Sequence, residues 1–586
     1  MNLFSFIIIL LTTFLTGNII SVGSGSYTTI FPGVDAAGRN SYPSGSPQLT
    51  GPALYKKTPT NDWWSKVIKE NHADNLFNYP MALKTINEGL VTSYIPWGVY
   101  DDQEPIINGI TNLNVSESKV YDFSDWTVTL DWSNENNFFR ATSGIGMPFI
   151  YFTKDSESLA QVKVNLGSVT VIEEKIIIED ARNGADFVIY APSGSVWNQN
   201  GIIYTSDLNG QNYWSMVMLP DINNNLIELS EEYSQFAYVF PENTYVEWDY
   251  NQSNSILTTE FFIDVDIKEG TFSKILQGIL PHQWNNLAID SPYPESNSYQ
   301  TVRGELKVLE DNYFKTQNKF VGILPTLPNL AHYSEGFNPS ELESKVNQIT
   351  NDQLSSWTDS YNEGQVMNRL IQTARIADQI GNENALNTII ETIKNRLEDW
   401  LTANSNEIAF IFYYNENWST MIGYPAGHGQ DYNINDHHFH WGYFIHAAAF
   451  IEQYNPGWAE SWGDMINHLI RDAASSDRND LLFPFLRSFS PFAGHCWANG
   501  FATFPQGNDQ ESSSESMQFN SSLIHWGSVT NNTEIRDLGI YLYTTEQTAI
   551  DEYWFDMYER NFSSNYPYSL VSRVWGNSYD NGTFWT

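Results

Sequence analysis

A chain of 586 residues is too long for one compact core, so we expect two or three domains. Its net charge of −40, from 29 Lys and Arg against 69 Asp and Glu, excludes nucleic acid and anionic membrane surfaces as partners, because binding phosphate requires a basic surface. A neutral substrate fits this charge, and the 20 Trp offer flat faces for sugar rings, although a large β-rich core explains them equally.

The N-terminus predicts a secretory signal peptide over residues 1–21. Its apolar run, from Leu3 to Leu15, is too short to span a membrane and is followed by small polar residues. We therefore expect a secreted protein, extracellular or in a cell wall. The single cysteine, Cys496, excludes an intrachain disulfide. Glycosylation sequons, which an Asn-rich chain also makes by chance, occur at Asn114, Asn251, Asn417, Asn520, Asn531, Asn561 and Asn581.

Period-two alternation dominates the first half of the chain and predicts strands. In "DWTVTLDW", the apolar residues from Trp126 to Trp132 fall at every second position and share one face. "QVKVNL" and "FVIYAPSG" show further strands, the latter running into a Pro-Ser-Gly turn. Short strands without helical periods between them predict an antiparallel β-sandwich over residues 30–270. A mixed, Pro-punctuated stretch over 271–345 predicts a connector.

From residue 346 to the end, at 586, the apolar period becomes helical. Residues 366–377 keep i, i+4 spacing until Gly381 ends the helix, and residues 386–401 form the next one. A later apolar stripe covers residues 535–542. Strands followed by helices indicate an all-β domain and then an all-α domain.

The stretch "DYNINDHHFHWGYFIHAAAF", residues 431–450, holds four of the 11 histidines. If a helix begins near Asp436, then Asp436, His440 and Tyr443 share one side of it. Three interpretations stay open. His437, His438 and His440 suggest a metal site but lack the His pair around a Glu that marks zinc proteases. Asp436 fits a helix N-cap. Asp436 also fits a catalytic acid, which requires a second carboxylate.

A second carboxylate occurs in the aromatic, Gly-rich segment 484–527, which is typical of a long active-site loop. Glu511 and Glu515 lie four residues apart. Ser512 and Glu515 also match a capping box, and in that register Glu511 stands just outside the helix. Two carboxyl groups from separate helix ends in an aromatic cleft are what glycoside hydrolysis requires.

Three long motifs, "NDHHFHWGYF", "FPFLRSFSPFAGHCWANG" and "NDQESSSE", resemble glycoside hydrolase family 81, the endo-β-1,3-glucanases. Weaker pieces such as "TNDWWSKVI" and "GILPTLP" extend the resemblance over most of the chain from residue 55. It implies an N-terminal β-sandwich, a small α/β connector, a C-terminal (α/α)6 barrel and hydrolysis with inversion. It also implies that Asp436 is the general acid, Glu511 the general base and Glu515 an essential neighbour.

The resemblance further implies that the chain acts on β-1,3-glucan polysaccharide or oligosaccharide. No convincing metal-ligand set is present in the sequence, so we expect neither a metal nor another cofactor, and we expect a monomer. Residues expected to contact sugar are His438, His440, Trp441, Tyr443, His495 and Trp497. Trp441 stands where the family more often has Tyr. A pocket of Phe439, Trp441 and Tyr443 is expected to keep Asp436 protonated by desolvation.

Two features keep alternatives open. Family members continue well beyond "SLVSRVWGNSYDNGTFWT", where this chain ends, so the sequence leaves open whether the barrel is complete. A degenerate barrel would fit a non-catalytic β-glucan-binding protein, whereas a structural wall glycoprotein would explain the acidity and the sequons but not the motifs.

Overall fold

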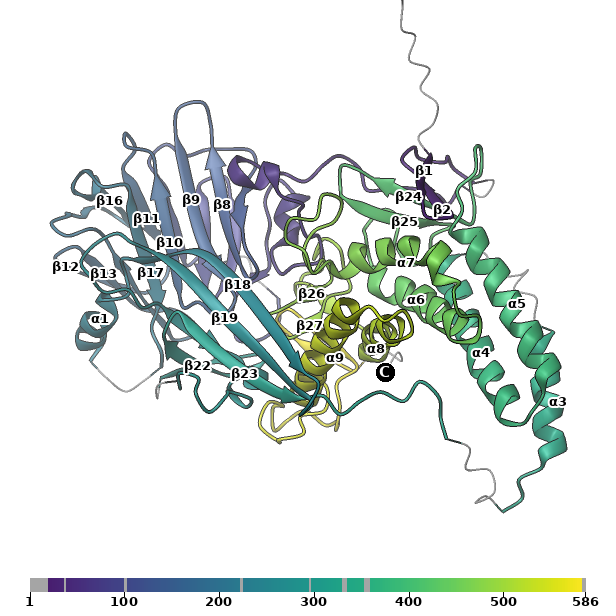
Figure 1. Cartoon of the computed structure of the whole chain (residues 1–586). Coiled ribbons are helices and arrows are strands. Elements are labelled where there is room, and N and C mark those ends of the chain that lie inside the picture. Colours follow the sequence, from purple (N-terminus) through teal and green to yellow (C-terminus); the bar gives the residue numbers. More distant parts are fainter. Residues whose placement is uncertain are drawn as a thin grey trace, which may run out of the picture.

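The computed structural model describes residues 19–35, 38–99, 103–221, 225–294, 297–328, 335–351 and 359–581. Most of the predicted signal peptide, residues 1–18, lies outside these ranges, and residues 19–21 belong to strand β1 (Ile19–Val22). Figure 1 shows a β-rich half and a helical half side by side. Within the part of the chain that is described, no helix is both long and apolar enough to cross a membrane.

Two large antiparallel sheets form the N-terminal half (Figure 1). The eight-stranded sheet has the order β12 (Ser168–Ile172), β13 (Lys175–Arg182), β14 (Ala185–Tyr190), β17 (Tyr213–Met218), β10 (Phe149–Lys154), β9 (Phe138–Gly144), β8 (Thr127–Ser133), β7 (Lys119–Phe123). The seven-stranded sheet has the order β15 (Asn198–Asn200), β16 (Ile203–Ser206), β11 (Ala160–Val164), β6 (Ile106–Ile110), β5 (Gly89–Ser93), β4 (Ala82–Ile86), β3 (Leu76–Phe77). Helix α1 (Leu226–Ser234) and the 3-10 turns η1 (Gly51–Tyr55), η2 (Ser65–Ile68) and η3 (Leu208–Gly210) accompany them.

The inner faces of the two sheets touch. Trp214 in β17 donates its indole N–H to Asn108 Oδ1 in β6 at 3.2 Å, across the core. The predicted inner face of the segment around β8 is buried at all four positions from Trp126 to Trp132. The antiparallel sandwich predicted from period-two alternation is therefore confirmed.

A second β unit follows the sandwich. Hairpin β18 (Val239–Asn251) and β19 (Ile256–Ile267) pairs with β23 (Tyr313–Lys319). A neighbouring sheet has the order β20 (Leu276–Ile279), β22 (Gly304–Glu310), β21 (Ser298–Thr301), with helix α2 (Pro281–Trp284) between its strands in sequence. The β19–β23 pairing joins residues on both sides of position 270, so one sheet spans the boundary that the sequence pattern suggested.

Seven helices of at least twelve residues lie in the described part of the C-terminal half. They are α3 (Pro339–Thr350), α4 (Ser360–Gln379), α5 (Glu383–Trp400), α6 (His437–Tyr454), α7 (Ala459–Ala474), α8 (Ser513–Val529) and α9 (Thr533–Tyr553). The helical periods over 366–377, 386–401 and 535–542 fall in α4, α5 and α9, so the change from strands to helices is confirmed. The six-hairpin arrangement of a full barrel stays a prediction.

Helix α6 lies at the centre of the helical half and packs against α4, α5, α7 and α8. It is buried on nearly every side, as expected of a helix that is apolar all round. Its small residues allow close approach, since a Cβ added at Gly442 would lie 3.0 Å from the Phe519 Cα of α8. This packing fixes the start of α6, where Asp436 and the histidines lie.

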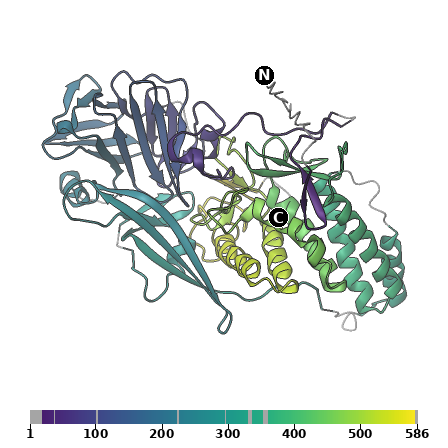
Figure 2. The same cartoon turned by 45° about the horizontal axis from the view of Figure 1, so that its top comes forward.

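Three small sheets lie in the helical half, and two of them join distant segments of the chain. Strands β1, β2 (Gly25–Thr28), β24 (Ile411–Asn415) and β25 (Thr420–Tyr424) form one sheet, and Figure 2 shows the purple N-terminal strand against the green helices. Strands β26 (Phe489–Ser490) and β27 (His495–Cys496) pair with each other. Strand β28 (Asp509–Gln510) pairs with β29 (Arg573–Trp575), which pairs with β30 (Tyr579–Asp580), so the last described residues lie beside Glu511.

Candidate active site

Asp436 occupies the N-cap position of α6, where its carbonyl accepts the His440 amide at 3.0 Å. Its backbone is left-handed, with φ of 62°, and its side chain makes no capping hydrogen bond to the helix. Its amide instead donates to the Ala498 carbonyl at 2.9 Å, which ties it to the long loop. The N-cap interpretation of Asp436 is therefore confirmed for its position and wrong for its side chain, which does not cap the helix.

Asp436 and Glu511 line the same cavity of about 200 Å³. Asp436 comes from the start of α6, and Glu511 follows β28, so the two carboxyl groups come from different elements, as predicted. The cavity also contains two residues that the sequence did not indicate, Asp509 and Arg573. The rest of its lining is His428, Asn435, Ala498, Asn499 and Phe504.

Arg573 is the cation of this cavity. It forms an ion pair with the Glu511 carboxylate, and its Nε lies 3.4 Å from Asp509 Oδ2. The antiparallel pairing of β28 with β29 sets this geometry by placing Asp509 opposite Trp575. Arg573 is 62 residues from Glu511 in sequence, so no local pattern could have linked the two.

The environment of Asp436 favours its protonated form. Burial raises the pKa of its carboxyl group well above the ordinary value, and the negative charges of Asp509 and Glu515 raise this pKa further. The positive charge of Arg573 lowers this pKa by a smaller amount. Burial also raises the pKa of Asp509, to about 6, although Arg573 partly offsets the effect. Desolvation was predicted, and the neighbouring carboxylates are an additional cause.

Glu515 is held by an aromatic hydroxyl. Tyr443 in α6 donates to Glu515 Oε1 at 2.7 Å, while the Glu515 amide donates to the Ser512 hydroxyl at 3.4 Å. The predicted N-cap at Ser512 is confirmed, with the carboxylate of Glu515 directed to Tyr443. Tyr361 in α4 packs edge-on against Tyr443, with ring centroids 6.0 Å apart. Three helices thus meet around Glu515.

Comparison with known proteins identifies the family. Residues 338–586 match the C-terminal domain of glycosyl hydrolase family 81. A glucan endo-1,3-β-D-glucosidase of Acetivibrio thermocellus is 37% identical over 558 residues, covering 91% of this chain and 69% of that protein. This chain belongs to glycoside hydrolase family 81. A second glucan endo-1,3-β-D-glucosidase, from Thermobifida fusca, is 34% identical, covering 97% of this chain and 75% of the relative.

A solved structure from the same family extends this result to the fold. The family 81 glycoside hydrolase of Clostridium thermocellum superposes with a TM-score of 0.90 and 35% identity, covering 97% of this chain and 79% of that one. Its similarity therefore spans both the β-rich and the helical half.

The histidines at the start of α6 contact different polar side chains. His440 Nδ1 lies 2.7 Å from the Ser360 hydroxyl, and His438 Nε2 lies 3.5 Å from Gln510 Nε2. Burial and the charge of His437 lower the pKa of both rings, that of His438 to about 3. His438 and His440 are fully buried, so they adjoin the site through Gln510 and Tyr361 rather than from an open surface.

Three of the predicted sugar contacts lie away from the cavity surface. Trp441 is fully buried in the helical core, and His495 and Trp497 are buried near Trp554. None of the three lines the cavity that holds Asp436, and their contact with sugar stays a prediction. The exposed aromatic surface belongs instead to His428 and to Phe504, which is 36% exposed, with Tyr361 half-buried beside His428.

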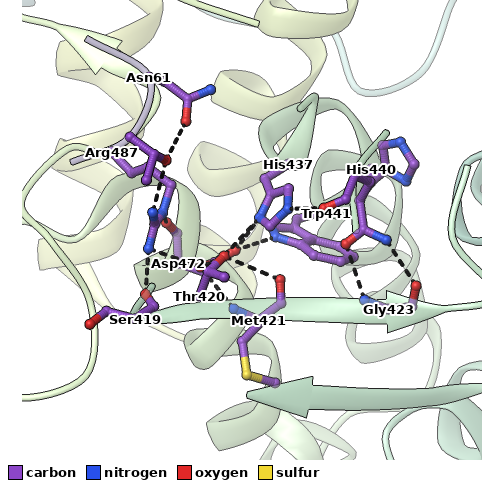
Figure 3. Close-up of polar contacts among 12 residues, drawn as sticks. Asn61, Ser419, Thr420, Met421, Gly423, His437, His440, Trp441, Asp472 and Arg487 are labelled. Atoms are coloured by element: carbon purple, nitrogen blue, oxygen red, sulfur yellow. Dashed lines mark hydrogen bonds and ion pairs between the residues drawn. The ribbon is translucent and has the colours of Figure 1, made fainter. Parts of the chain in front are cut away.

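Asp472 in α7 explains why Trp441 is buried (Figure 3). This fully buried carboxylate accepts the Trp441 indole N–H at 2.8 Å and lies 2.6 Å from His437 Nδ1. Its other oxygen accepts from the Thr420 hydroxyl and the Met421 amide in β25, each at 3.0 Å. Burial alone would raise the pKa of Asp472, but the charges of His437 and Arg487 outweigh it and lower the pKa.

Arg487 extends this network to the N-terminal half (Figure 3). Its Nε donates to the Asp472 carbonyl at 2.8 Å, and its Nη1 donates to the Thr60 hydroxyl at 3.0 Å. The Thr60 hydroxyl donates to the side-chain oxygen of Asn61. The side-chain nitrogen of Asn61 lies 3.3 Å from the Ala498 carbonyl, which also accepts the backbone amide of Asp436. The network therefore reaches the backbone of Asp436.

Removing the Asp472 carboxylate should destabilise the protein strongly. In Asp472→Ala, Arg487 and His437 stay buried without their partner, which costs about 3–5 kcal/mol in similar buried pairs. The urea unfolding midpoint of the full chain measures the loss. Asp464→Ala, at an exposed position of the same helix, is the control and should change stability by less than about 0.5 kcal/mol. Equal effects of the two substitutions would contradict the role given to Asp472.

Proposed function

We propose that this chain is a secreted endo-1,3-β-D-glucanase that hydrolyses β-1,3-glucan with inversion, using Asp436 as general acid and Glu511 as general base. The observation that carries the proposal is the shared cavity, in which one carboxyl group is buried with a raised pKa and the other is paired with a cation. The names of the family 81 relatives support the substrate class.

In the proposed reaction, Asp436 donates its proton to the glycosidic oxygen as the bond from that oxygen to C1 breaks. Glu511 removes a proton from a water molecule, and the water oxygen forms the new bond to C1 from the opposite face. Such a water requires the two carboxyl groups to stand about 6.5–9.5 Å apart. Glu511 ends protonated and Asp436 ionised, and exchange with solvent restores both.

Neighbouring residues position these groups. Glu515, oriented by Tyr443, adds negative charge that keeps the Asp436 proton bound. We assign Glu515 one of two roles: it holds the attacking water, or it balances the charge of the site. The exposed rings of His428 and Phe504, with Tyr361, are proposed to bind glucose rings, and His438 and His440 to support this wall from beneath.

Secretion and a monomeric state belong to the same proposal. Four sequons, at Asn114, Asn251, Asn417 and Asn531, lie at exposed positions where a glycan fits. Asn520 is fully buried in α8 and donates to Glu546 at 2.7 Å, so a glycan does not fit on this side chain in the folded protein.

Replacing the general acid should stop turnover but not binding. In Asp436→Asn, the side chain keeps its size but cannot donate the proton, so laminarin hydrolysis should fall about 10²–10⁴-fold. Reducing-sugar release measures hydrolysis, and calorimetry measures binding with the affinity expected within about twofold of wild type. Asp464→Asn serves as the exposed control.

Activity of Asp436→Asn within a few-fold of wild type would refute the acid assignment. Binding of laminarin without sugar release by the wild-type protein would instead favour the alternative, a non-catalytic β-glucan-binding protein.

The anomeric form of the first product tests the role of Glu511. A single displacement converts the β-1,3 bond into an α-configured reducing end, which then mutarotates. Proton NMR in the first minutes of the reaction should therefore show the α-anomer in excess. An initial β-anomer would mean double displacement, with Glu511 or Glu515 as nucleophile.

A further inference from the structure

A second cavity lies in the helical half, apart from the one that holds Asp436. It has a volume of about 200 Å³ and lies among helices α4, α6 and α8, with residues 323–325 at its edge. No residue lines both cavities. Figure 1 shows the three helices together, and α6 packs against both of the others.

Arg375 in α4 is the charged residue of this cavity. It is 3% exposed, and neither its Nε nor its Nη2 has a hydrogen-bond partner. Among the residues that the structure describes, none that lines the cavity carries a carboxylate, and no ion pair to Arg375 is formed. A guanidinium stays charged in proteins, and burying it without a counter-charge is strongly unfavourable.

Two neutral histidine rings supply further donors near Arg375. Gln518 Nε2 lies 3.2 Å from His446 Nδ1, and since the amide N–H donates, the neutral ring carries its proton on Nε2. Burial and the charge of Arg375 lower the pKa of His446 to about 3 and that of His525 to about 4, so both rings are neutral and each supplies one N–H. The Ser521 and Ser522 hydroxyls donate to the backbone carbonyl of Gln518 within α8, so they present acceptor lone pairs rather than protons.

We propose that this cavity binds a small oxyanion, which the unpaired charge of the Arg375 guanidinium holds. Carboxylates and phosphate-like groups share the paired acceptor oxygens that match a guanidinium. The volume exceeds the roughly 30 Å³ of one water molecule several-fold, so it accommodates such a group.

The position gives this site a link to the proposed active site. His446 follows Tyr443 by three residues in α6, and Gln518 follows Glu515 by three residues in α8, which is one helical turn in each case. A bound anion would therefore bridge α4, α6 and α8 one turn from the Tyr443–Glu515 hydrogen bond. The inference itself concerns binding and does not depend on the proposed activity.

The test is calorimetric titration of the full chain with sodium phosphate, sulfate or acetate, at constant sodium concentration balanced with chloride. We expect saturable binding of one anion per chain and a matching rise of the thermal midpoint. Binding of phosphate or sulfate alone would identify a tetrahedral ligand, and binding of acetate alone a carboxylate. Absence of saturable binding for all three would overturn the proposal.

Two variants locate the site. Arg375→Gln should weaken binding at least tenfold while folding normally, because it removes an unpaired buried charge. Arg369→Gln, at an exposed position of α4 outside the cavity, should leave the affinity unchanged. Unchanged affinity in Arg375→Gln would overturn the assignment. If Arg375→Gln fails to fold, Gln518→Leu replaces it, and full affinity there would likewise overturn the site.

Discussion

The buried carboxylate of Asp472 is the constraint on which the helical half depends. A charge with no exposed surface is tolerated only when every lone pair has a donor and a cation lies nearby. Helix α6 supplies His437 and Trp441, strand β25 supplies a hydroxyl and an amide, and Arg487 supplies a guanidinium. Because all these hydrogen bonds form together, they fix the rotation of α6 about its axis. The position of Asp436, directly before the first turn of α6, is fixed with it.

The same network explains how the two halves of the chain form one site. Arg487 reaches Thr60, which precedes the β-sandwich, and Asn61 reaches the loop carbonyl that holds the Asp436 amide. The β28–β29 pairing brings Arg573 to the cavity from near the end of the chain. The proposed acid is therefore held by the fold, and the proposed base by an ion pair.

Raised pKa values in this site work against stability at high pH. The folded state holds protons on Asp436 and Asp509 more tightly than the unfolded chain does. Their favourable contribution is complete below the unfolded pKa, near 4, and for Asp509 it is lost as the pH rises through about 6. The environment that suits acid catalysis therefore lowers stability in neutral solution.

Sequence patterns predicted what depends on local order. The alternation from Trp126 to Trp132, the start of a helix after Asp436 and the cap at Ser512 all arise within a few residues. Contacts between distant segments were not predictable. Trp441 lies on the same helix as Tyr443, and the position of Asp472 in another helix explains why Trp441 is directed into the core.

The central claim, that Asp436 is a carboxylic acid kept protonated by its surroundings, is tested most directly by difference infrared spectroscopy. The spectrum of the wild-type protein minus that of Asp436→Asn isolates the carbonyl stretch of this one side chain. At about pH 6, two units above the ordinary aspartate pKa, we expect the band of a protonated carboxyl group. A carboxylate band at that pH would show that Asp436 is ionised and would contradict the account.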